Sequence, residues 1–74
     1  MTREQAIEEA TRVASSIPVT KESPPMTVPV ADEDASICWM VTFKPDEYSR
    51  MDERGYWMDW LRWAFESVIE APLE

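Results

Sequence analysis

The stretch GYWMDWLRWAF, residues 55–65, decides which fold this chain is expected to adopt. It contains three of the four tryptophans, together with a tyrosine and a phenylalanine. On a helical wheel at about 100° per residue, the apolar side chains from residue 57 onward gather in an arc of roughly 180°, and charged side chains fill the opposite arc. The apolar arc holds Trp57, Met58, Trp60, Leu61, Ala64, Phe65, Val68 and Ile69. This pattern predicts a C-terminal amphipathic helix.

The start of this predicted helix is open, whereas Pro72 marks its end. The sequence SRMD at residues 49–52 reads as a capping box with Asp in place of the usual Glu or Gln, which would begin the helix near residue 50. Gly55 costs about 1 kcal/mol inside a helix relative to Ala, which favours a start at Tyr56 instead. The helix is therefore expected from residue 50 or 56 to residue 70.

Two aromatic residues, Tyr56 and Trp63, fall outside the apolar arc and share one flank of the wheel. Trp63 would either lie flat over the rim of a sheet or stand exposed. Exposed aromatic side chains within a charged rim are typical of binding hot spots. On this second reading, the predicted partner-binding residues are Tyr56, Asp59, Trp63, Glu66 and Glu70.

The N-terminal part of the chain predicts a helix over residues 3–17. Thr2 and Gln5 form a capping box, in which the hydroxyl and the amide satisfy free N–H groups at the helix start. Apolar residues then recur three and four positions apart as far as Ile17, and Pro18 ends the pattern. Because the buried stripe is mostly alanine, we expect this helix to lie close against a sheet.

Two segments in the middle of the chain have the pattern of strands. Residues 26–31 alternate apolar and other side chains, and Pro29, which lacks an N–H, restricts this strand to an edge of the sheet. Residues 36–43, SICWMVTF, give the strongest strand signal, with Phe43 on the face expected to be the core. Pro45 is expected to end the second strand.

Together these elements predict a single α+β domain over residues 1–74, of order α-β-β-α. An antiparallel hairpin carrying Trp39 and Phe43 would be packed on one face by both helices. The helix–hairpin order from Ala6 to Phe43 resembles that of PepSY-like and cystatin-like domains, although no residue is carried over from either family. The open face of so small a sheet is a reason to expect a partner.

The charge balance limits the classes of partner. Seven basic residues stand against fifteen acidic ones, giving a net charge of −8. This disfavours direct binding to nucleic acid or an anionic membrane and favours a basic partner, although acidity also keeps small proteins soluble. No run approaches the ~18 apolar residues of a membrane span. Since no signal-peptide pattern is present either, the expected location is cytoplasmic.

The residues that carry chemistry argue against an enzyme. Histidine is absent, so the single cysteine, Cys38, has no imidazole to activate it and no partner for an internal disulfide. Zinc sites need several Cys or His ligands, and the acidic run at residues 32–34 lacks the spacing of an EF-hand loop. Gly55 is the only glycine, which leaves no phosphate-cradling loop. We expect no catalytic residue, no cofactor and no metal.

Two hypotheses from different classes follow. The first is a non-catalytic protein-binding module, an inhibitor or adaptor that covers a basic and, in one variant, nucleic-acid-binding surface of a partner. Phage-encoded inhibitors of bacterial defence nucleases and toxin-immunity proteins are similar to this chain in size, acidity and lack of a catalytic set, although no motif is shared. The second is a structural or accessory subunit that self-associates as a homo-oligomer through the C-terminal aromatic helix, its acidity serving solubility alone.

Overall fold

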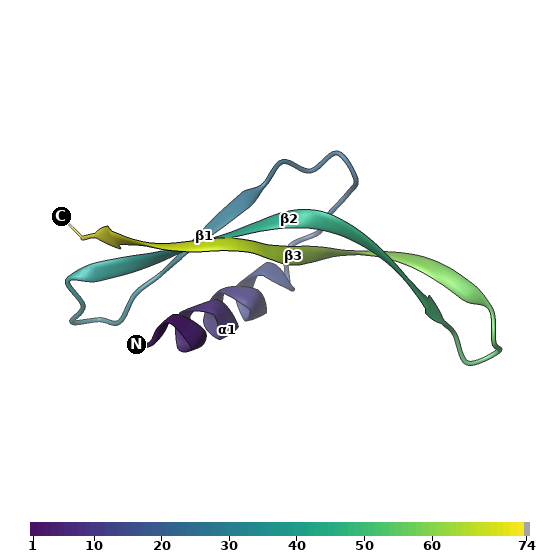
Figure 1. Ribbon diagram of the computed structural model, residues 1–74, viewed down its shortest axis with the longest axis horizontal. Coiled ribbons are helices and arrows are strands. Elements are labelled where there is room, and N and C mark those ends of the chain that lie inside the picture. Colours follow the sequence, from purple (N-terminus) through teal and green to yellow (C-terminus); the bar gives the residue numbers. More distant parts are fainter. Residues whose placement is uncertain (74) are drawn as a thin grey trace.

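The computed structural model describes residues 1–73, which form one helix and three strands. Helix α1 spans Arg3–Ala14, and strands β1, β2 and β3 span Met26–Val30, Ile37–Met51 and Trp57–Pro72. The strands form an antiparallel sheet in the order β1-β2-β3, and α1 packs on one face of it (Figure 1). We call the face that α1 covers the helix side and the opposite face the open face.

The predicted C-terminal helix is wrong, and the order is α-β-β-β rather than α-β-β-α. Residues 57–72 form β3, which pairs with β2 along its length. Large apolar side chains occupy both faces of this segment, so its sequence fits a helical period and leaves the two-residue period of a strand unclear. Trp, Phe, Val and Ile favour strands, and the fifteen residues of β2 supply the pairing partner. Pairing with β2, which helical spacing alone cannot reveal, therefore decides the structure.

The residues predicted to start the helix form a hairpin turn instead. The N–H of Gly55 donates to the carbonyl oxygen of Asp52 at 3.1 Å, and Gly55 has a φ of 87°. The carboxylate Oδ1 of Asp52 accepts hydrogen bonds from the backbone N–H groups of Arg54 and Tyr56, both at 2.9 Å. This is a three-residue loop closed by a glycine in the left-handed region. Gly55 therefore reverses the chain rather than interrupting a helix.

Strand β2 continues past Pro45, where the sequence predicts its end. Strand β1 pairs with β2 only between Trp39 and Phe43, so β2 has a single neighbour beyond that point. The missing N–H of Pro45 can then face the unpaired edge, which is where sheets tolerate proline. The predicted strand of residues 36–43 accordingly matches only the first half of β2.

Helix α1 begins as the sequence predicts and ends at Ala14. The Thr2 hydroxyl accepts from the backbone N–H of Gln5 at 3.2 Å, and the Gln5 amide oxygen accepts from the N–H of Thr2 at 2.9 Å, which completes the capping box. The helix buries three alanines against the sheet, Ala6, Ala10 and Ala14. Their small side chains let the helix backbone lie close to the strands.

The core lies between α1 and the helix side of the sheet. Its largest fully buried side chains are Val41 and Phe43 of β2. Trp39 packs at its border, so the face of β2 predicted to be the core is the one that α1 covers. The cluster consists of Ala10, Ala14, Val28, Val30, Val41 and Phe43.

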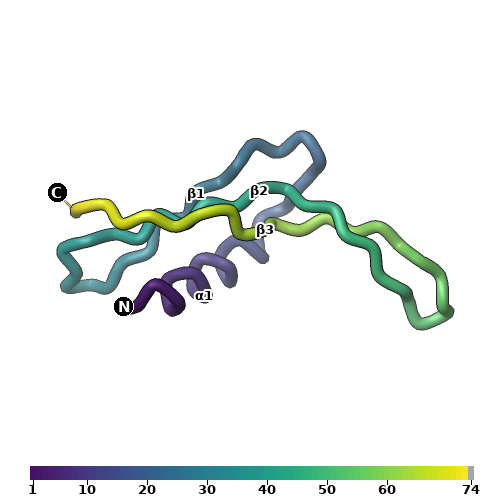
Figure 2. Tube along the Cα trace, in the orientation of Figure 1, coloured from purple at the N-terminus to yellow at the C-terminus, as the bar shows by residue number. Residues whose placement is uncertain are grey.

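Strands β2 and β3 run on beyond α1 and β1 as a two-stranded ribbon (Figure 2). We call this ribbon, residues 44–64, the arm. The radius of gyration is 14.9 Å, whereas a compact domain of this length has one of about 11 Å. The molecule measures 50 Å along its longest axis and 17 Å along its shortest. The arm therefore makes the molecule elongated.

Candidate partner-binding site

The arm encloses no core of its own. Each of its strands has one neighbour, and none of the side chains of residues 44–64 is fully buried. An isolated two-stranded hairpin is marginally stable in water. Contacts at its root and along its faces must therefore hold it in place.

The segment that follows α1 braces the root of the arm on the helix side. The indole Nε1 of Trp63 donates to the carbonyl oxygen of Ile17 at 3.0 Å, and the ring packs against the border of the core. Further out, Lys21 Nζ lies 2.8 Å from Glu47 Oε1. The hydrogen bond and the negative charge of Glu47 raise the pKa of Lys21 above its ordinary value. These two contacts fix the direction in which the arm leaves the domain.

Arginine–aromatic pairs order the open face of the arm. The guanidinium of Arg62 lies 4.5 Å from the centre of the Tyr48 ring, and its Nε lies 3.2 Å from Asp46 Oδ2. The guanidinium of Arg50 lies 4.7 Å from the centre of a Trp60 ring. Such cation–π contacts contribute about 0.5–1 kcal/mol each at exposed sites. The open face of the arm is thus ordered in the free protein, and such order lowers the entropic cost of any binding there.

Large apolar side chains are exposed to solvent around the tip of the arm. Tyr56 and Trp57 are 67% and 69% exposed, and Met51, paired with Trp57 across the hairpin, is 53% exposed. Met58 and Trp60 are also exposed, on the opposite, open face of the arm. Single exposed apolar residues are ordinary, but several gathered around the end of one ribbon are typical of an interaction site. We call these five side chains the tip cluster.

The five site residues predicted from the sequence do not form one flank of a helix, because their segment is a strand. Tyr56 and Asp59 lie in the arm, and Trp63 lies at its root, half-buried. Glu66 sits at the register shift of β3, and Glu70 lies farther along, in the three-stranded part of the sheet. At about 3.4 Å per residue, Tyr56 and Glu70 are roughly 48 Å apart along the strand. The five predicted residues therefore lie spread along β3 and do not gather into one site.

Helical spacing missed the exposure of Trp57 and Met51. It placed Trp57 in the core and gave Met51 no role, whereas both are exposed beside the turn. A sequence signal was present, because a short run containing Gly55 between two apolar segments is typical of a hairpin loop. Taking Asp52 to Gly55 as a turn would have placed both side chains at the tip of a ribbon.

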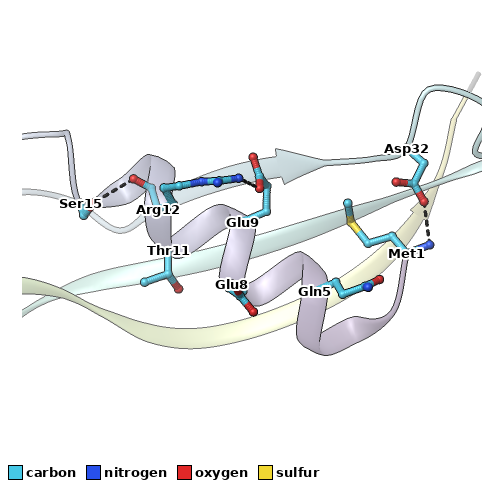
Figure 3. A pocket seen from close by; sticks show the side chains of 8 residues that line it. All are labelled: Met1, Gln5, Glu8, Glu9, Thr11, Arg12, Ser15 and Asp32. Atoms are coloured by element: carbon cyan, nitrogen blue, oxygen red, sulfur yellow. Dashed lines mark hydrogen bonds and ion pairs between the residues drawn. The ribbon is translucent and has the colours of Figure 1, made fainter.

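A polar hollow runs along α1 (Figure 3). Arg12 forms an ion pair with Glu9, and the Ser15 hydroxyl donates to the carbonyl oxygen of Arg12 at 2.7 Å. At the other end, the amino group of Met1 lies 2.6 Å from Asp32 Oδ2. Because these charged groups pair with one another, the hollow offers no convergent set to a ligand. It is lined by Met1, Gln5, Glu8, Glu9, Thr11, Arg12, Ser15 and Asp32.

Two further properties hold for the described residues, 1–73. None of the helices there is long and apolar enough to cross a membrane. Within the same range, no three acidic or cysteine side chains gather closely enough to hold a metal ion.

Comparison with known proteins adds no further constraint on the function. Neither a protein-family model, nor a curated protein, nor a solved structure matches the chain. Function is therefore inferred from the arm and its tip cluster.

Proposed function

We propose that this protein is a non-catalytic protein-binding module, acting as an inhibitor or adaptor, and that the arm is the element that contacts its partner. The observation that carries the proposal is the tip cluster, where Tyr56 and Trp57 are about two-thirds exposed at the end of a braced hairpin. Aromatic side chains dominate binding hot spots and lose little rotamer freedom on burial. A pre-ordered arm carrying them fits a partner that offers an apolar cleft.

The partner we propose has a basic surface around that cleft. The arm carries five acidic and four basic residues, a net charge of −1, so the rest of the chain carries −7 of the total of −8. Much of that charge lies in the loop at residues 32–34 and at Glu66 and Glu70. Attraction between this charge and a basic partner would speed the encounter, while burial of the tip cluster would slow dissociation.

One form of this proposal is competition with nucleic acid. A basic surface that binds nucleic acid releases counterions when phosphates cover it, and spaced carboxylates can do the same. Phage inhibitors of defence nucleases and toxin-immunity proteins, which cover a partner's functional surface, are models for such a role. On this proposal the partner's nucleic acid and the present protein would exclude each other.

Affinity capture from a lysate of the source cell or its host, followed by binding kinetics with the purified partner, tests the proposal. We expect Trp57→Ala to increase the dissociation rate about 30-fold, as loss of a hot spot does. Added salt should lower mainly the association rate. Val13→Ala is the matched control, since Val13 is an exposed apolar residue of α1, 41% accessible, away from the arm.

Two outcomes would contradict the proposal. Equal partner affinity for the wild type and for a Tyr56→Ala, Trp57→Ala double variant would exclude the tip cluster as the contact. An association rate that does not change with salt would exclude a basic partner surface.

A further inference from the structure

The two faces of the arm carry opposite charge. On the open face there are three basic side chains and one acidic side chain, Asp46, a net charge of +2. On the helix side, Glu47 and Asp59 give −2. The open face of the arm is therefore a basic surface on a chain whose net charge is −8. We call the following residues the basic face: Lys44, Tyr48, Arg50, Trp60 and Arg62.

Contacts within the arm hold both guanidinium groups of the basic face in place and leave them most of their donors. Arg50 lies over the Trp60 ring and forms none of the ion pairs in the described part of the chain. Arg62 lies over the Tyr48 ring, and its Nε donates to Asp46 Oδ2 at 3.2 Å. A guanidinium has five N–H donors. Both arginines therefore keep donors for an external anion, and their order lowers the entropic cost of binding it.

We propose that the basic face binds an acidic segment of a partner protein in an extended conformation. Arg62 pairs with Asp46 across the ribbon, so the three cations lie at the levels of residues 44, 46 and 50 along β2. At about 3.4 Å per residue, the second and third lie roughly 7 and 20 Å beyond Lys44. An extended segment has the same rise per residue. Carboxylates on its first, third and seventh residues would therefore reach Lys44, Arg62 and Arg50.

The middle of the basic face suits an apolar residue of that segment. The fifth residue would lie at the level of Tyr48, which pairs with Trp60 across the ribbon, and Trp60 is 38% exposed. Alternate side chains of an extended segment point to one side, so a single strand supplies all four contacts. Arginine binds carboxylates through two parallel N–H donors, which adds geometric selectivity to the charge.

The charge of the whole chain favours a short acidic segment over nucleic acid, the other polyanion that fits a basic ribbon. Outside the arm the chain carries −7, which would repel a long polyanion that extends beyond the basic face. Tyr48 and Trp60 already stack on guanidinium groups, which leaves less ring surface for nucleobases. Charge complementarity thus selects a segment with a few carboxylates, about as long as the face itself.

This contact goes beyond the proposed function and does not rest on it. Trp57 and Met51 of the tip cluster lie on the helix side, where Glu47 and Asp59 suit the basic partner surface proposed above. The basic face points the other way and would repel that surface. The arm would therefore hold a basic partner on one side and an acidic segment on the other, as an adaptor does.

Fluorescence anisotropy of a labelled peptide, Glu-Ser-Glu-Ser-Leu-Ser-Glu, titrated with the full chain tests the proposal. We expect this peptide to bind, added salt to weaken it, and the same peptide with Gln for Glu not to bind. Arg50→Gln should raise the dissociation constant about fivefold. Arg3→Gln is the matched control and should leave it unchanged, since it removes the same charge at the exposed start of α1. Circular dichroism checks the fold of both variants.

Equal binding of the acidic and the Gln peptides would overturn the proposal, and so would equal dissociation constants for Arg50→Gln and Arg3→Gln. Tighter binding of a single-stranded thymidine oligonucleotide than of the acidic peptide would overturn the assignment of a protein segment. Trp57→Ala should keep full peptide binding, and its loss there would place the contact on the tip cluster instead. Because the two contacts are lost in different variants, failure of the proposed function is distinguishable from failure of this proposal.

Discussion

The indole nitrogen of Trp63 donates a hydrogen bond of 3.0 Å to the carbonyl oxygen of Ile17, forty-six residues earlier in the chain. This bond joins the root of the arm to the segment that leaves α1. It fixes the arm relative to the only part of the described chain that has a core. The direction of the arm therefore depends in part on this side chain, which is half-buried at the junction.

Trp63→Phe should lower the free energy of unfolding by about 1 kcal/mol, because the Ile17 carbonyl loses its donor. Urea denaturation followed by circular dichroism measures this loss. Trp57→Phe is the control, since Trp57 is exposed and its substitution should change stability by less than about 0.5 kcal/mol. Equal stability of the two variants would contradict a bracing role for the bond.

Gly55→Ala should destabilise the hairpin by about 1 kcal/mol through its backbone alone. The φ of Gly55 is 87°, and a Cβ added there would meet nothing within 4 Å, so no steric contact contributes. Asn tolerates left-handed conformations better than Ala does. Thermal unfolding should therefore give the highest melting temperature for the wild type, a lower one for Gly55→Asn and the lowest for Gly55→Ala. A Gly55→Ala variant as stable as the wild type would contradict the turn geometry.

Ala10→Leu should cost about 1–3 kcal/mol, because Ala10 is fully buried where α1 meets the sheet and larger side chains strain a packed core. Val13→Leu on the exposed side of the same helix is the control and should be nearly neutral. Chemical denaturation of both variants measures the difference. A neutral Ala10→Leu would mean that the helix does not approach the strands as closely as the structure has it.

The contact between Lys21 and Glu47 should show in an alkaline titration. Because Glu47 raises the pKa of Lys21 above 10.5, the charged form is favoured in the folded state. The resulting stabilisation is present below the ordinary pKa of Lys21 and is lost as pH rises through its folded-state pKa. NMR titration of the lysine side-chain carbons should place the Lys21 midpoint lower in Glu47→Gln than in the wild type, and an unchanged midpoint would contradict the contact.

The N-terminal half of the fold follows from the sequence because its determinants are local. The capping box of Thr2 and Gln5, the edge position of Pro29 and the core face carrying Trp39 and Phe43 all depend on neighbouring residues or on a two-residue period. The prediction of a C-terminal helix was wrong because residues 57–72 are apolar on both faces. In such a segment, helical spacing of apolar residues does not distinguish a helix from a strand.

The length of β2 and the shape of the site depend on distant parts of the chain. Whether Pro45 ends the strand depends on how far β1 extends beside it, which no local pattern states. Tyr56 and Asp59 do lie in the arm, yet the spacing that grouped them with Glu70 belongs to a helix that does not form. The tip cluster could have been found from the turn at Gly55, whereas the bracing by Ile17 and Lys21 could not.

An arm that encloses no core gives its residues unusual evolutionary freedom. On the proposed function, substitutions at Trp57 or Met51 would change what the protein binds and, because both are exposed, would cost little folding stability, whereas changes at the buried Ala10, Val41 or Phe43 would be removed by loss of stability. Lineages of this protein should therefore diverge fastest at the tip of the arm. A change in partner could be followed there within a few substitutions, on a scaffold that stays the same.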